Sequence, residues 1–327
     1  MPALKLSFLD LATVEREGSV AAALSHSVRL AQTAEASGYE RIWYAEHHNM
    51  PTIASSSPAV LIAHIASQTS TIGLGSGGVM LPNHSPLVVA EQFGTLAELH
   101  PGRIHLGLGR APGTDGATFR ALRRSVQAAD AFPNDVLELQ AYLGDDLPVT
   151  GVNAYPGRGT RVPITILGSS LFGANLAAQL GLPYSFASHF APQALGAAVQ
   201  HYRSNYKPSA AHPEPYVSAG VNVVAAETDD AAKELFGRAE IERIRSFLSR
   251  GRDIPLTVAQ AESLRETPAA TEIRSMMRYT AVGGPERVRE QLADFAKLAD
   301  ADELVTVHPA PTREEQLASL RIGAAAA

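Results

Sequence analysis

The chain has 327 residues, of which 45% are hydrophobic and 18% are charged, as is usual for a globular protein. A formal net charge of −6 without a long basic run argues against nucleic acid as a partner, and the lack of cysteine excludes disulfides, thiol nucleophiles and thiolate metal ligands. No signal-peptide layout opens the chain and no stretch approaches the roughly 20 apolar residues of a membrane helix, so we expect a cytoplasmic protein with no membrane partner.

Strand and helix patterns alternate along the whole chain. Short apolar runs of strand length are followed by segments with the apolar spacing of helices. Strands are predicted at 4–9, 41–45, 72–80, 103–109, 164–167, 184–187, 217–225 and 303–307. Helices are predicted at 20–36, 58–67, 86–99, about 117–142, and 171–180. Ser57, directly before Pro58, is the predicted N-cap of the second helix.

This alternation predicts an α/β fold, a closed (β/α)8 TIM barrel forming a single domain over residues 1–327. An open doubly wound sheet is the alternative, but no G-x-G-x-x-G motif follows the first strand. Two stretches interrupt the alternation: a Pro- and Gly-rich excursion at about 147–162 and an insertion at about 250–278, before the last strand. We expect the insertion to be partly helical and to lie over the substrate at the barrel mouth.

Glu46, His47 and His48 follow the second predicted strand. In α/β barrels the loops after the strands carry the active site, which makes this trio a candidate for acid–base chemistry. The structural alternative is that one histidine packs in the core and is bound by Glu46. A metal site built from these three residues and His84 is not predicted, because no H-x-x-x-H or comparable spacing is present.

Glycine and arginine mark the ends of the third and fourth strands. Gly77 and Gly78 either let a flat ligand approach the backbone or allow tight packing of a helix against the strand. Arg110 suits a phosphate, because the guanidinium presents a fixed fork of donors. A salt bridge from Arg110 to Glu91 or Asp115 is the structural alternative.

The ends of the fifth and sixth strands complete the candidate mouth. Ser169 and Ser170 open a helix, where free backbone N–H groups and the helix dipole favour an anion, although a serine there also serves as an ordinary N-cap. His189 and Phe190 follow the sixth strand. Together with Phe8 of the first strand, they are candidates for contacting an apolar or aromatic substrate.

Four blocks of this sequence, in register, resemble the luciferase-like, flavin-dependent monooxygenase family, in particular its single-chain luciferase-family oxidoreductases. They are Trp43-Tyr44-Ala45-Glu46-His47-His48, residues 72–82, residues 101–110, and Leu167-Gly168-Ser169-Ser170. The likeness covers roughly residues 4–195 and continues more weakly near 283–307. It implies a (β/α)8 barrel that binds FMN at its C-terminal face, usually as a homodimer.

The resemblance also implies roles for individual residues. Arg110 would hold the FMN phosphate together with Ser169, Ser170 and the neighbouring Gly173. The pair Gly77-Gly78, where relatives often have a non-proline cis peptide, would pass beneath the isoalloxazine ring. His47 falls on the position of the family's catalytic histidine, and Glu46 matches a carboxylate of the same site.

The implied reaction is that of a monooxygenase. Reduced FMN, delivered as a co-substrate by a separate flavin reductase, would react with O2 to give a flavin peroxide that inserts one oxygen atom into an organic substrate. Gly109 replaces a reactive-position cysteine of the luciferase α chain, and Ser169-Ser170 replace a Glu-Ser pair, so light emission is not implied. A deazaflavin-dependent dehydrogenase and a non-catalytic flavin-binding protein are the alternatives.

Overall fold

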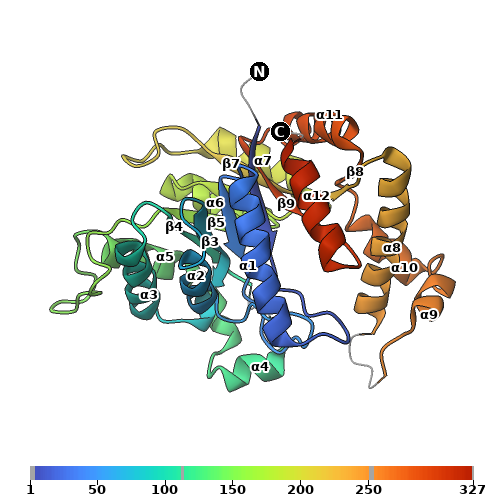
Figure 1. The fold of residues 1–327 in the computed structure, drawn as a ribbon. Coiled ribbons are helices and arrows are strands. Elements are labelled where there is room, and N and C mark those ends of the chain that lie inside the picture. Colours follow the sequence, from blue (N-terminus) through green and yellow to red (C-terminus); the bar gives the residue numbers. More distant parts are fainter. Residues whose placement is uncertain (1–3, 112–113, 250–253, 326–327) are drawn as a thin grey trace.

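The chain closes a ring of parallel strands surrounded by helices (Figure 1). The computed structural model describes residues 4–111, 114–249 and 254–325. Within these residues the ring order is β6-β5-β4-β3-β2-β1-β9-β7, and β6 pairs with β7 to complete it. The predicted eight-stranded α/β barrel is therefore confirmed.

The strand bounds agree with the sequence prediction to within one or two residues. The nine strands of the described residues are β1 (Lys5–Asp10), β2 (Arg41–Tyr44), β3 (Gly73–Met80), β4 (Ile104–Gly109), β5 (Ile164–Gly168), β6 (Tyr184–Phe186), β7 (Val217–Ala225), β8 (Thr280–Gly283) and β9 (Glu303–Val307). The short β8 was not predicted. β8 pairs with residues 222–225, the last four of β7, whereas β9 pairs with residues 218–222 of the same strand. β8 therefore extends the sheet without entering the ring.

Twelve α-helices are present in the described residues. They are α1 (Val20–Ala36), α2 (Pro58–Ala66), α3 (Pro86–Leu99), α4 (Gly116–Ala121), α5 (Phe132–Leu143), α6 (Leu171–Leu180), α7 (Leu195–Asn205), α8 (Asp229–Leu248), α9 (Val258–Ser263), α10 (Pro268–Ser275), α11 (Pro285–Leu298) and α12 (Arg313–Ala325). Short 3-10 turns are η1 (Leu81–Asn83), η2 (Val126–Asp130) and η3 (Pro192–Ala194). Ser57 occupies the N-cap of α2, but its side chain makes no capping hydrogen bond to this helix within the described residues.

The predicted continuous helix at 117–142 is wrong. The segment contains α4, the turn η2 and α5 in succession. Arg123 has a φ of +57°, a left-handed conformation that ends the first helical stretch, and Pro133 stands at the start of α5, where its missing N–H costs nothing. Apolar spacing continued across the break, which is why the pattern alone suggested one helix.

Side chains alternate between two cores along each strand. The larger core lies between the sheet and the helices and includes Phe8, Ile42 and Leu320. A second cluster inside the ring is made of Leu9, Trp43, Ala45 and Val305, with no described helix contributing a buried side chain to it. This alternation decides which strand residues can face the interior of the barrel.

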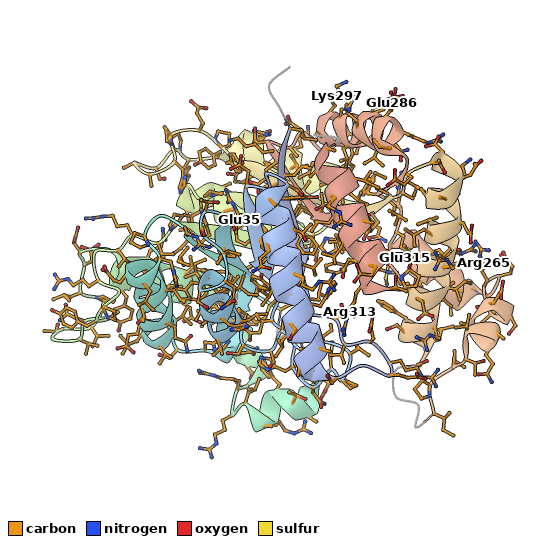
Figure 2. All side chains as sticks on the ribbon, in the orientation of Figure 1. Glu35, Arg265, Glu286, Lys297, Arg313 and Glu315 are labelled. Atoms are coloured by element: carbon orange, nitrogen blue, oxygen red, sulfur yellow. The ribbon has the colours of Figure 1, made fainter. Side chains whose placement is uncertain are left out.

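The insertion forms a small helical layer of its own. Its first residues, 250–253, lie outside the described residues; beyond them α9 and α10 pack on α8 around Ile241, Ile244 and Ile273. Arg265, labelled at the right of Figure 2, pairs with the largely buried Glu240 of α8 at 2.6 Å. The predicted helical content is confirmed, whereas its position over a substrate remains a prediction.

No helix in the described part of the chain is both long and apolar enough to cross a membrane.

The excursion between α5 and β5 carries neither helix nor strand, yet it is firmly packed against α3. A Cβ added to Gly94 of α3 would lie 2.0 Å from Cα of Gly157, and one added to Gly157 would lie 2.4 Å from the carbonyl oxygen of Ala90. Two backbones therefore touch here, which only glycine permits.

We expect Gly94→Ala to destabilise the protein by about 1–3 kcal/mol, because the new methyl group overlaps the backbone of Gly157. Gly237→Ala in α8 is the matched control, since a Cβ added there would have nothing within 4 Å and alanine is the better helix former by up to about 1 kcal/mol. Urea unfolding of both variants is the measurement. Equal stabilities would contradict the close contact.

Candidate active site

Apart from Phe8, the residues predicted for the site lie at or near the carboxyl ends of five neighbouring strands. β2, β3, β4, β5 and β6 are consecutive in the ring, so the loops that follow them are neighbours in space. In Figure 1 α4, which follows the loop after β4, is drawn at the lower side of the molecule. This is the face on which (β/α)8 barrels carry ligands.

Glu46 binds the loop after β3 to the loop after β2. Its side chain is fully buried. Nε2 of His48 lies 2.8 Å from Oε1, Nε2 of His84 lies 2.9 and 3.0 Å from the two oxygens, and Nδ2 of Asn83 donates to Oε1 at 3.2 Å. The backbone N–H of Met80 donates to Oε2 at 3.0 Å. Every one of these donors lies in one of the two loops or at the end of β3.

The Glu46 carboxylate is ionised at neutral pH. Burial alone would raise the pKa of this carboxyl, but hydrogen bonds from His48 and His84 and the N–H of Met80 outweigh burial and lower that pKa to about 2. His48 is thus bound by Glu46, as the structural alternative anticipated for one histidine, but its side chain is 18% exposed and does not pack in the core. No group of His, Asp or Glu side chains in the described residues is arranged to hold a metal ion.

His47 lies between these two residues in the chain, with its side chain only partly buried. Its backbone N–H donates to the carbonyl of Ser55 at 3.1 Å, which fixes the loop against the segment that leads into α2. Asn83 and His84 were not among the predicted site residues. Their 37- and 38-residue separation from Glu46 leaves no local signal, and only the order of β2 and β3 in the ring brings them together.

Gly77 and Gly78 are joined by a cis peptide, at the point where the register between β3 and β4 shifts. A Cβ on Gly77 would lie 2.7 Å from Cβ of Trp43, and one on Gly78 would lie 2.5 Å from Cδ1 of Leu167. Packing of the barrel interior therefore requires both glycines, with or without a ligand. Their contact with a cofactor remains a prediction.

Arg110, directly after β4, is exposed and stacks on an aromatic ring. Its Cζ lies 4.0 Å from the centroid of Phe172, in the first turn of α6. The alternative salt bridge to Glu91 or Asp115 is not formed among the described residues; Asp115 instead caps α4 and accepts a hydrogen bond from Asn49 at 3.0 Å. Sequence reasoning missed Phe172, since a phenylalanine in a first helical turn gives no sign of its partner.

The first turn of α6 presents its backbone donors without a side-chain cap. Ser170 occupies the N-cap position in extended conformation, but its side chain makes no capping hydrogen bond within the described helix. Ser169 and Ser170 are both exposed. The simple N-cap explanation for Ser170 therefore fails, and the N–H groups beside Arg110 remain available to an anion.

Gly173 has a packing role in the structure. A Cβ there would lie 3.3 Å from Cε2 of Tyr184 and 3.4 Å from Cα of Gly168. Because glycine has no side chain, α6 can begin close to the end of β5. The hydroxyl of Tyr184 donates a hydrogen bond to the carbonyl of Ser170 at 3.1 Å. Gly173 therefore supports the first turn of α6 from beneath.

His189 and Phe190 lie after β6, as predicted. The His189 ring is pressed onto β7, where a Cβ on Gly220 would lie 2.3 Å from its Nδ1. Burial, with a smaller contribution from the charge of Arg243, lowers the pKa of His189 to about 3. Phe190 is 45% exposed, with its ring centroid 5.0 Å from that of His189. An uncharged histidine and an exposed phenyl ring thus stand at this edge of the mouth.

Phe8 does not lie at the mouth, contrary to the prediction. Its side chain is fully buried in the outer core and its ring packs against His308 at 5.8 Å between centroids. His308 is in turn hydrogen-bonded to Ser319 of α12 at 2.8 Å. The adjacent residue Leu9 faces the interior instead. A strand offers alternate residues to each face, and the prediction assigned Phe8 to the wrong one.

Comparison with known proteins agrees with this fold and shows the family of the chain. The luciferase-like monooxygenase family model matches residues 4–302. The chain belongs to this family. It is 45% identical over 303 residues to a luciferase-like monooxygenase of Escherichia coli K12, covering 92% of this chain and 90% of the relative. It is 32% identical to the N-acetyl-S-alkylcysteine monooxygenase of Bacillus subtilis, covering 98% and 97% of the two chains.

Solved structures show the same barrel. The crystal structure of apo-MsnO8 superposes with a TM-score of 0.88 at 36% identity, covering 99% of this chain and 98% of that one. More distant structures share the fold alone. One is the oxygenating constituent of 3,6-diketocamphane monooxygenase from Pseudomonas putida in complex with FMN (TM-score 0.72, 16% identity, covering 98% and 96%). Another is an F420-dependent secondary alcohol dehydrogenase (0.70, 14%, covering 97% of each chain).

We expect His105 and His189 to make the free energy of unfolding sensitive to mild acid. Burial lowers the pKa of His189 to about 3 and that of His105 to about 4, whereas an unfolded histidine titrates near 6.5. Between these values the unfolded state binds more protons than the folded state. The free energy of unfolding should therefore fall by about 1 kcal/mol per histidine between pH 7.5 and 5.5.

Urea unfolding at the two pH values measures this loss. His189→Gln should make the loss smaller, whereas His64→Gln, which removes an exposed histidine of α2, should leave it unchanged. A loss of the same size in the His189 variant and in the wild type would contradict the assignment.

Proposed function

We propose that this protein is an FMN-dependent monooxygenase that inserts one atom of O2 into a small organic substrate. The observation that carries the proposal is the pairing of Arg110, stacked on Phe172, with the uncapped first turn of α6. A guanidinium and a set of free backbone N–H groups side by side suit a phosphate monoester. Membership of the luciferase-like monooxygenase family supports the oxygenase chemistry.

Each end of the site has a distinct task in this proposal. Arg110, Ser169 and Ser170 would hold the phosphate, and the backbone of Gly77-Gly78 would border the flavin ring. Reduced FMN, when bound, supplies the electrons that activate O2. His47 would donate and accept protons at the reacting atoms, since imidazole exchanges protons near neutral pH. Phe190 and the insertion carrying α9 would limit the access of water.

The reductant, the assembly and the substrate class belong to the same proposal. The sequence contains no nicotinamide-binding fingerprint, so we propose that a separate flavin reductase supplies reduced FMN. Homodimerisation is proposed from the resemblance alone, and light scattering tests it. The B. subtilis relative named for N-acetyl-S-alkylcysteine makes a thioether the first compound to assay, before aldehydes and polyketide-like compounds.

Arg110→Ala should weaken FMN binding about 10- to 100-fold, because charge-assisted hydrogen bonds to the phosphate are lost. Riboflavin, which has no phosphate, should bind the variant and the wild type equally. Arg120→Ala removes an exposed charge from α4 at the same end of the barrel and should change neither affinity. Fluorescence titration with both flavins measures this; equal weakening for FMN and riboflavin would refute the phosphate contact.

His47→Ala should retain FMN affinity while oxygenated product falls by at least about 100-fold, as expected for loss of a general acid–base group. Product that carries label from ¹⁸O2 and depends on reduced FMN identifies the monooxygenase. Substrate oxidation that requires oxidised F420 and no oxygen would instead identify a deazaflavin-dependent dehydrogenase. Stoichiometric FMN binding without oxygen consumption would identify a non-catalytic flavoprotein.

A further inference from the structure

The buried carboxylate of Glu46 restricts the protonation of two imidazole rings. An ionised carboxylate only accepts hydrogen bonds, so each group within hydrogen-bonding distance must donate. Nε2 of His48 at 2.8 Å and Nε2 of His84 at 2.9 and 3.0 Å must therefore each carry a hydrogen. In a neutral imidazole this leaves Nδ1 as the acceptor, by the same reasoning that fixes histidine tautomers beside carboxylates in metal sites.

His84 is the more accessible of the two rings. Its side chain is 30% exposed, compared with 18% for His48, while the carboxylate between them is fully buried. His84 is the C-cap of η1, four residues after the end of β3, which carries Gly77-Gly78. Its Nε2 contacts both carboxylate oxygens, whereas Nε2 of His48 contacts one.

The charged and titratable groups named around His84 come from two segments. Glu46, His47 and His48 belong to the loop after β2. From the segment between α4 and α5, Nε of Arg124 donates to the carbonyl of Asn83 at 3.2 Å and places a positive charge beside the loop. Glu46 is the negative group in direct contact with the ring, and it offsets the charge of Arg124.

We propose that Glu46 is a positioning residue that fixes His48 and His84 as Nε2–H tautomers, and that Nδ1 of His84 is a second acid–base group of the active site beside His47. Nδ1 of His84 takes a proton from a group at the mouth, and the ring becomes an imidazolium. The Nε2 hydrogen stays in place, Glu46 remains ionised and stabilises the new charge, and the proton then leaves from Nδ1 to solvent. No proton passes through the carboxylate.

The tautomers are tested on the protein without cofactor, independently of the function proposed above. Two-dimensional ¹⁵N–¹H spectra of protein labelled at its 11 histidines separate Nε2–H from Nδ1–H rings, and single His→Gln variants assign the signals. We expect Nε2–H tautomers for His48 and His84 at pH 7.5. An Nδ1–H tautomer for either ring would overturn the positioning role. In Glu46→Gln the side chain has one acceptor oxygen instead of two and no negative charge, so the preference of the two rings for the Nε2–H tautomer should weaken.

The catalytic role of His84, which rests on the proposed function, is tested by two variants. The amide nitrogen of Gln reaches the place of Nε2, so His84→Gln keeps the donor to Glu46 but removes Nδ1. We expect FMN affinity and unfolding midpoint near those of the wild type, kcat lowered at least about 10-fold, and one ionisation missing from the pH profile. His84→Ala should be partly restored by added imidazole.

The outcomes separate the two proposals. His64→Gln is the control and should match the wild type in kcat and pH profile. A wild-type protein without FMN-dependent turnover would refute the proposed function and leave the tautomer result intact. A wild-type pH profile in His84→Gln, together with no rescue of His84→Ala by imidazole, would refute the acid–base role of His84.

Discussion

The ionised carboxylate of Glu46 is the interaction on which the active-site end of this barrel depends. A charge removed from water is costly unless its hydrogen-bonding capacity is satisfied. Glu46 meets this condition with a backbone N–H, an amide and two imidazoles, all from β3 and the loops after β2 and β3. Replacing it would remove the acceptor that these four donors share, so the carboxylate connects the two loops.

The opposite side of the site is organised by exposed rather than buried charge. Arg110 is held over Phe172 by a cation–π contact, and the turn that begins α6 is shaped by Gly168, Gly173 and Tyr184. An exposed guanidinium is not committed to a structural ion pair in the described residues, so it can bind an anion without first losing a partner. The buried carboxylate of Glu46 thus holds His48 and His84 on one side of the site. The exposed guanidinium of Arg110 lies on the other side.

Sequence patterns predicted the fold more completely than the site. The eight ring strands were found because each is an apolar run of strand length followed by a helix or turn signal. The helix at 117–142 was wrong because apolar spacing does not register a single left-handed residue such as Arg123. Phe8 was assigned to the wrong face because a strand buried on both faces has no alternation to read. Phe172 and His84 were missed because their partners lie at distant positions in the chain.

The glycines of β3 and β4 show how packing and function can require the same residue. Trp43 fills the interior of the ring, and a side chain on Gly75 or Gly77 would collide with it. Gly107 similarly admits the carbonyl oxygen of Ser76. Gly77 and Gly78 have no side chains, so this stretch of β3 presents only backbone atoms. Packing therefore explains why glycine is needed here, and contact of this segment with a flavin remains a proposal.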